Sequence, residues 1–174
     1  MTIICNIIAN IYLIFMGLLI FISNLRYLFF LKKMLSVTGT LYFLTDTVNE
    51  ICVHKRYLYI PHHTCAIFGF YIFYYINLDT NTIHIYGLSL SIMEYTSLII
   101  NIRTVMKNKK MLTLKYDLIM YINYFLIRCL FYPYIIFNYV NDPILYYAST
   151  SVLLMSIYWS ILWTKTIYYK ITHI

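Results

Sequence analysis

The sequence predicts an all-α polytopic membrane protein with six transmembrane helices, and both its composition and the spacing of its apolar runs indicate this class. Hydrophobic residues make up 62% of the 174 residues and charged residues only 11%, whereas about a quarter of a soluble domain is charged. So few charges cannot cover a globule in water, and a lipid bilayer is the expected environment. Short polar or basic segments separate six apolar runs without a change in composition, so residues 1–174 are expected to form one domain.

The six apolar runs are close to the length that a helix needs to cross a bilayer, about 20 residues at roughly 1.5 Å each. The first run has no basic segment before it and no small-residue cleavage site, which indicates a retained span rather than a signal peptide. Trp159 and Trp163 lie near the end of the last run, where aromatic residues commonly meet the membrane interface. We expect spans at about residues 3–23, 35–52, 57–76, 83–102, 118–138 and 144–164.

The distribution of basic residues predicts the orientation. Six spans place both termini on one side, and that side collects most of the Lys and Arg residues, with the most basic loop at residues 103–117. Because cytosolic loops carry an excess of bases, we expect cytosolic termini. Three bases in the loop at residues 24–33 oppose this layout, and an alternative makes residues 35–52 a re-entrant hairpin with the N-terminus outside. The net charge of +7 is better explained by topology and lipid headgroups than by nucleic-acid binding.

Five ionisable residues from four of the expected spans fall at a similar depth, namely Asp46, His62, His63, Glu94 and Arg128. Their spacing from the span centres places them in one slab roughly 6–7 Å thick. Each charge facing lipid would cost about 2.5–3.5 kcal/mol, so we expect all five to turn inward. Arg128 is then expected to pair with Asp46 or Glu94, and a histidine to serve the remaining carboxylate, in one shared polar pocket. The other side chains available to line this pocket are Tyr59, Ser91, Tyr95, Thr96, Ser97 and Asn101.

Each of these residues also has an alternative interpretation. Asp46 and Arg128 can serve only to stabilise the packing of helices against each other, and an intramembrane histidine is often only a hydrogen-bonded helix contact. The adjacent imidazoles of His62 and His63 favour a function more strongly, because both need a partner and they cannot face the same one. We expect no metal site, because neighbouring residues on a helix diverge by about 100° and zinc needs three or four ligands. Glycine-rich nucleotide-binding loops and hydrolase motifs are absent from the sequence.

Four stretches resemble the TLC-domain family, which includes the ceramide synthases, the translocating-chain-associating membrane proteins and several smaller proteins. They are LYFLTD at 41–46, PHH at 61–63, MEYTSLIINIR at 93–103 and LIRCLFYPYII at 126–136, in that order, over more than half of the chain. The resemblance implies a six-helix bundle around a central pocket for a long lipid chain, in the endoplasmic reticulum or a related membrane. His62 and His63 match the paired histidines that the ceramide synthases require for acyl transfer.

The fourth run departs from the synthase pattern. The synthases carry His-Asp followed by a further Asp, whereas residues 93–97 here are Met, Glu, Tyr, Thr and Ser. This form is closer to the smaller TLC-domain proteins, which are associated with lipid composition and homeostasis. The resemblance therefore implies a protein that binds, senses or moves a long-chain lipid, with membrane lipids as its partners and without a cofactor.

An alternative function is acyl transfer from acyl-CoA, as substrate, to a sphingoid base or related lipid. One histidine of the pair then acts as base or acyl acceptor, and the other holds it in place. Asp46 or Glu94 orients the imidazole, and Arg128 stabilises the developing oxyanion or anchors the thioester. A third hypothesis is proton-coupled transport, because His, Asp and Glu in one layer can relay protons.

Overall fold

The computed structural model describes residues 3–54, 60–75, 78–140 and 142–173, and within these ranges every regular element is a helix. The all-α prediction is therefore confirmed. Two short segments, η1 and η3, are π-helical. The elements are α1 (Ile3–Ile22), α2 (Leu25–Asn49), η1 (Glu50–His54), α3 (Ile60–Tyr75), α4 (Thr80–Asn108), α5 (Leu114–Phe125), η3 (Leu126–Phe131), α6 (Tyr132–Tyr139) and α7 (Pro143–Thr172).

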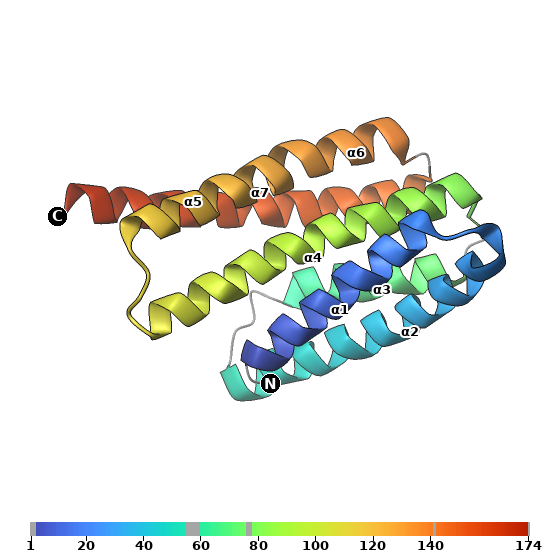
Figure 1. Cartoon of the computed structure of the whole chain (residues 1–174), viewed down its shortest axis with the longest axis horizontal. Coiled ribbons are helices and arrows are strands. Elements are labelled where there is room, and N and C mark those ends of the chain that lie inside the picture. The colour runs from blue at the N-terminus through green and yellow to red at the C-terminus, as the bar shows by residue number, and fades with distance from the viewer. Residues whose placement is uncertain (1–2, 55–59, 76–77, 141, 174) are drawn as a thin grey trace.

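The described helices form six rods, because η1 continues α2 and the elements α5, η3 and α6 follow one another without a break. Successive rods run in opposite directions, so the start of α1 and the end of α7 face the same end of the molecule (Figure 1). Each rod packs against two others in the order α1, α2, α3, α7, α5–α6, α4 and back to α1, with the most extensive contact between α1 and α4. The six rods therefore form a ring, and its order brings α3 beside α7 and α1 beside α4.

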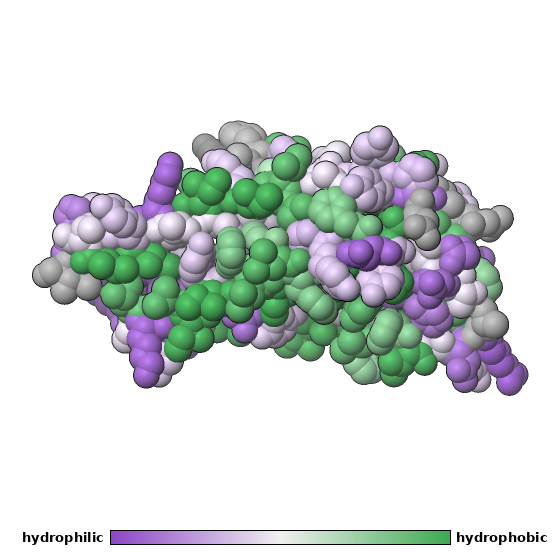
Figure 2. Space-filling view, turned by 90° about the horizontal axis from the view of Figure 1, so that it is seen from above, coloured by the Kyte–Doolittle hydropathy of each residue, from purple (hydrophilic) through white to green (hydrophobic). Residues whose placement is uncertain are grey.

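Four of the described helical segments are long and apolar enough to cross a membrane, namely α1, α4, α5–α6 and α7. Figure 2 shows apolar side chains across the middle of one face, with hydrophilic groups gathered mainly toward its two ends. This distribution is typical of a membrane protein. The other two rods differ from these four, because α2 carries Arg26, Lys32 and Lys33 and only 16 residues of α3 are described.

The helices are longer than the sequence predicts at several ends. The expected loop at residues 24–33 is wrong, because α2 begins at Leu25 and continues without a break to Asn49. This continuous helix also excludes the re-entrant hairpin. Lys32 is buried within the fold, with its ammonium 5.6 Å from the ring centroid of Phe73, so the helix accommodates a base that was expected in a loop. The basic loop expected at 103–117 is reduced to residues 109–113 between α4 and α5.

Glycines allow the close contact between α1 and α4. A Cβ atom on Gly17 would lie 2.5 Å from the carbonyl oxygen of Gly87, and one on Gly87 would lie 2.7 Å from Cγ2 of Ile20. Ser91 crosses the same contact, since its hydroxyl donates to the carbonyl oxygen of Ile14 at 3.0 Å. Close backbone approach through small residues is a common way for membrane helices to associate. It sets the register that brings polar residues of α1 opposite those of α4.

A proline and two capping aspartates explain further local features. Pro133 lacks the amide that would bond to the carbonyl of Cys129, and just before it the chain adopts the wider π turn, with the Tyr132 amide bonded to the carbonyl of Ile127. Asp79 begins α4 by accepting hydrogen bonds from the Thr82 side chain and amide, which hold the pKa of Asp79 below its usual value. Asp142 caps the start of α7 by accepting hydrogen bonds from the amides of Ile144 and Leu145.

A buried carboxylate joins α4, α5 and α7 at the end of the molecule where α7 finishes. Asp117 is fully buried, and its Oδ1 accepts from Nε of Arg103 at 2.6 Å and from Nε1 of Trp163 at 2.8 Å. Its Oδ2 accepts from Nζ of Lys170 at 2.5 Å. The Arg103 guanidinium lies 4.5 Å from the ring centroid of Trp163. Trp163 is therefore a buried partner of this network.

Candidate functional site

A polar cavity of about 280 Å³ lies inside the ring of rods. It is lined from α1, α2 with η1, α3, α4 and α7, which are five of the six rods. Six of the residues that the sequence singled out line it together, so their predicted convergence is found in the structure. The polar lining residues are Asn6, Asn10, Asp46, Glu50, His62, His63, Glu94, Ser97, Asn101, Thr104 and Asn108, and the others are Ile3, Tyr42, Phe43, Ile100 and Trp159.

Glu94 is held at the cavity wall by a chain of two amides. Nδ2 of Asn101 donates to Oδ1 of Asn10 at 2.7 Å, and Nδ2 of Asn10 donates to Oε2 of Glu94 at 2.5 Å. Asn101 lies two turns beyond Glu94 on α4, so Asn10 of α1 bridges two points on one face of α4. Asn10 and Glu94 are both buried. The chain thus joins α1 to α4 and fixes the carboxylate beside the cavity.

His63 is fixed by two residues of α2. Its Nδ1 lies 3.1 Å from Oγ1 of Thr47, and the Thr47 hydroxyl lies 2.6 Å from the carbonyl oxygen of Phe43, to which it donates. Because the hydroxyl has one proton, its oxygen accepts from Nδ1–H of His63. Nε2 of His63 then faces Oδ2 of Asp46 at 3.5 Å. His63 therefore lies between the hydroxyl of Thr47 and the carboxylate of Asp46.

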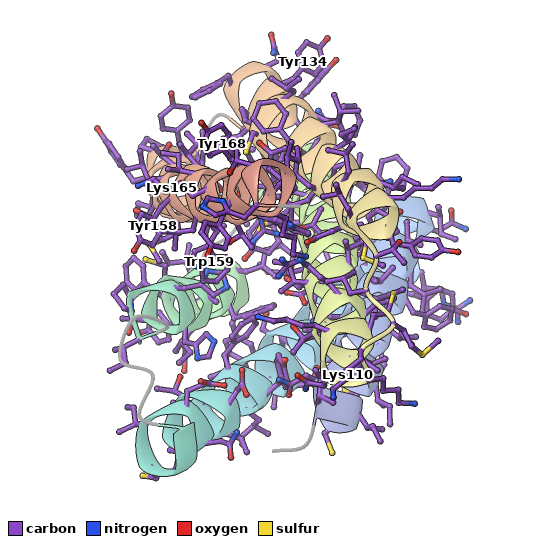
Figure 3. All side chains as sticks on the ribbon, turned by 90° about the vertical axis from the view of Figure 1, so that its left-hand side faces the viewer. Lys110, Tyr134, Tyr158, Trp159, Lys165 and Tyr168 are labelled. Carbon is purple, nitrogen blue, oxygen red and sulfur yellow. The ribbon has the colours of Figure 1, made fainter. Side chains whose placement is uncertain are left out.

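His62 has a different environment from its neighbour. It is buried, its ring lies 5.5 Å from that of Trp159 and 6.3 Å from that of Phe43 between centroids, and its Nδ1 has no hydrogen-bond partner among the residues that the structure describes. Figure 3, which looks along the bundle, shows Trp159 between α7 and α3. The side chain of His62 is therefore held by aromatic rings and keeps a polar atom for a further partner. Trp159 also lines the cavity.

A second, narrow cavity of about 40 Å³ adjoins the first. The two cavities share Phe43, His62 and Glu94 in their walls. Most of the remaining lining is apolar or aromatic, including Phe70 and Val152. Ser89 also lines the narrow cavity, is buried, and has an Oγ atom without a hydrogen-bond partner in the described parts of the chain. His62 and Glu94 thus stand where a polar chamber meets an apolar one.

Arg128 does not form the expected ion pair. Its guanidinium donates from Nη1 to the carbonyl oxygen of Met93 at 2.7 Å and to Oγ1 of Thr96 at 2.8 Å, and from Nε to Oγ of Ser156 at 2.8 Å. Within the described residues, neither Asp46 nor Glu94 makes a salt bridge with Arg128, so that predicted pairing is wrong. Arg128 is also not among the residues that line the two cavities. Its hydrogen bonds join the π segment η3 to α4 and α7, so Arg128 contributes to the packing of these helices.

Three other predicted pocket residues, Tyr95, Ser91 and Thr96, lie elsewhere. The side chain of Tyr95 is 40% exposed on the outside of α4 and lines neither cavity. Tyr59 lies outside the described residues. Ser91 and Thr96 contact neighbouring helices, because Ser91 bonds to α1 and Thr96 accepts from Arg128. Of the residues predicted from the fourth expected span, Glu94, Ser97 and Asn101 therefore line the polar cavity.

Sequence reasoning missed the contribution of α1 to the site. Asn6 and Asn10 both line the polar cavity, and Oδ1 of Asn6 has no hydrogen-bond partner among the described residues. The signal was present in the sequence, because two amides four residues apart in an apolar run lie on one face of a helix. The i, i+3, i+7 series Glu94, Ser97 and Asn101 marks the opposing face of α4 in the same way.

The described residues include no group of three or more His, Cys, Asp and Glu side chains arranged to hold a metal ion. No protein-family model matches the chain, and no curated protein or solved structure matches it significantly. The chemistry of the site therefore has to be inferred from its own residues. These are a fixed carboxylate, a histidine–aspartate pair, and a second histidine at the boundary between a polar and an apolar cavity.

Proposed function

We propose that the protein is a TLC-like integral membrane protein of six spans that binds a long-chain lipid inside its ring of helices and acts in lipid homeostasis by sensing or moving that lipid. The observation that carries this proposal is the pair of adjoining cavities, one polar and one apolar, which share His62, Phe43 and Glu94. An amphipathic molecule needs this combination, since its head requires hydrogen-bonding partners and its chain requires apolar walls. The compartment implied by the resemblance is the endoplasmic reticulum or a related endomembrane.

Acyl transfer is the second candidate, and one observation favours it. His63 is oriented by Asp46 and Thr47, while Nδ1 of the neighbouring His62 has no partner among the described residues and lies at the cavity wall. A nucleophile or base next to an oriented imidazole is an arrangement that catalysis uses. Two features weigh against it. Arg128 is engaged elsewhere, and the described lining of the polar cavity contains no Lys or Arg to bind the phosphates of coenzyme A.

Native mass spectrometry of the purified protein in lipid nanodiscs tests the binding proposal. We expect the wild-type protein to retain a long-chain lipid and Ser89→Leu to retain roughly tenfold less, because excluding a methylene from an apolar pocket costs about 1–3 kcal/mol. Ser89 donates to no described residue, so the larger side chain fills the narrow cavity without breaking a hydrogen bond. Ser151→Leu, on α7 and outside the lining of both cavities, is the control and is expected to retain the lipid.

The same preparation decides between binding and catalysis. The protein is incubated with acyl-CoA and either a long-chain base or a lysolipid, and acylated products are measured. We expect bound lipid and no turnover. A product that disappears in His62→Leu while the protein remains folded would establish acyl transfer instead. Absence of retained lipid together with absence of product would refute both functions.

A further inference from the structure

At the end of the molecule where α7 finishes, several helices extend farther than is needed to cross a bilayer. At about 1.5 Å per residue, the 29 residues of α4 and the 30 residues of α7 extend for roughly 44–45 Å, whereas the hydrocarbon core is about 30 Å thick. The 20 residues of α1 match that thickness. The rods end close together at the right of Figure 1, but α4, α5 and α7 continue beyond α1, α2 and α3 at its left. The additional length therefore lies at one end, at the level of the lipid headgroups or beyond.

This part of the chain, residues 103–117 of α4–α5 and 163–173 of α7, is here named the basic extension. Its exposed bases are Lys107, Lys109, Lys110, Lys115 and Lys165. None of these five lysines makes an ion pair with a described residue. The only acidic residue in the two ranges is Asp117, which is buried and accepts hydrogen bonds from Arg103 and Lys170. The surface of the basic extension is thus positively charged, with no acid of its own to neutralise it.

The rigidity and the aromatic content of the basic extension match a membrane surface. The Asp117 network fixes α4, α5 and α7 to one another, so the lysines are presented from a constrained frame. Three exposed tyrosines, Tyr116, Tyr168 and Tyr169, accompany them. Tyrosine is enriched at the membrane–water interface because its ring is apolar and its hydroxyl is polar. Lys110, in the turn after α4, and Lys165 of α7 lie well apart in Figure 3, which suits many headgroups better than one small anion.

We propose that the basic extension binds the anionic headgroups of the surrounding membrane and so enriches anionic lipid around the end of the bundle into which the polar cavity extends. The cavity reaches this end through Thr104 and Asn108 of α4. Basic clusters directly beside a membrane span attract anionic lipid by about 1 kcal/mol for each Lys or Arg near the surface. This surface lies outside the cavity, so its lipid preference is independent of the lipid proposed to occupy the interior.

The test is to reconstitute the protein into nanodiscs of phosphatidylcholine with a minority of phosphatidylserine. The lipids that remain bound after gentle detergent extraction are then counted by native mass spectrometry. We expect phosphatidylserine to be enriched over its share of the nanodisc. In Lys109→Gln with Lys110→Gln, the enrichment is expected to fall by about fivefold for each lysine removed, which is the ratio that corresponds to about 1 kcal/mol. High salt is expected to lower the wild-type enrichment as well.

The matched control, Arg26→Gln with Lys33→Gln, removes two exposed bases from the N-terminal half of α2, far from the basic extension. This control is expected to keep the wild-type enrichment. Equal enrichment in the Lys109/Lys110 variant and the wild type would overturn the proposal, as would an equal loss in the control. In a further experiment, the water-soluble headgroup glycerophosphoserine is added to the protein in nanodiscs of phosphatidylcholine alone. Binding there as strong as to the lipid would show that the surface is a site for a free anion, which also overturns it. Both variants are expected to unfold at the wild-type temperature, since the four side chains lie on the surface.

Discussion

Replacing Asp117 with alanine is expected to lower the free energy of unfolding by about 3–5 kcal/mol, which is typical when one partner of a buried charged network is removed. The carboxylate accepts from three side chains on two other helices, namely Arg103, Trp163 and Lys170. Without it, two positive charges lie near each other with no acid between them, and the indole N–H of Trp163 loses its acceptor. Thermal unfolding of the purified protein, followed by circular dichroism, measures the loss.

Asp142→Ala is the control for the Asp117 substitution. Asp142 also stands at the start of a helix, but among the described residues its carboxylate accepts only from the amides of Ile144 and Leu145, at the surface. Loss of such a cap costs about 1 kcal/mol. A loss for Asp117→Ala that is no larger than that for Asp142→Ala would mean that the network does not hold α4, α5 and α7 together.

The two adjacent histidines are expected to respond differently to the same substitution. His62→Leu is expected to weaken retention of the lipid by roughly tenfold or more while the unfolding temperature changes little, because a polar group of the bound molecule loses its partner. No hydrogen bond from Nδ1 of His62 to a described residue is lost with it. His63→Leu is expected to cost about 1–3 kcal/mol of stability, because it removes the contacts to Thr47 and Asp46 and leaves those buried groups less well satisfied.

Lipid retention by native mass spectrometry and thermal unfolding, measured on both variants, separate these effects. The expected pattern is a loss of ligand without a loss of stability for His62→Leu, and a loss of stability for His63→Leu. If His62→Leu destabilised the protein more than His63→Leu and left retention unchanged, His62 would be a structural residue. The division of roles between the two histidines would then be refuted.

Much of the fold follows from the apolar runs, but the helix ends do not. Each expected span coincides with one of the six rods, because long uncharged runs leave few alternatives to a helix. The sequence predicts loops at 24–33 and 103–117, because Lys and Arg residues are expected to end apolar helices. The structure continues α2 through Lys32 and α4 through Arg103, since a lysine can pack over an aromatic ring and an arginine can reach a carboxylate on another helix.

The position of a site residue can be predicted from the sequence where the free-energy cost of exposing its side chain to lipid determines that position. Asp46, His62, His63 and Glu94 converge because each is expensive to expose to lipid. This free-energy cost does not identify the hydrogen-bond partners of these residues. Arg128 is satisfied by a backbone carbonyl and two hydroxyl groups in place of a carboxylate, and Glu94 by the amide of Asn10. Neutral partners are common in every sequence, so only the packing of the helices decides which of them are used.

Cysteine accessibility along α4 tests most directly whether the polar faces of the helices turn toward one water-accessible interior. Single cysteines are placed at Ser97 and Asn101, which line the cavity, and at Tyr95, which faces outward from the same helix. The four native cysteines are first replaced with serine or alanine. A charged, water-soluble thiol reagent is then applied to the protein in membranes. We expect Ser97→Cys and Asn101→Cys to react and Tyr95→Cys to resist, whereas the reverse order would contradict an interior polar chamber.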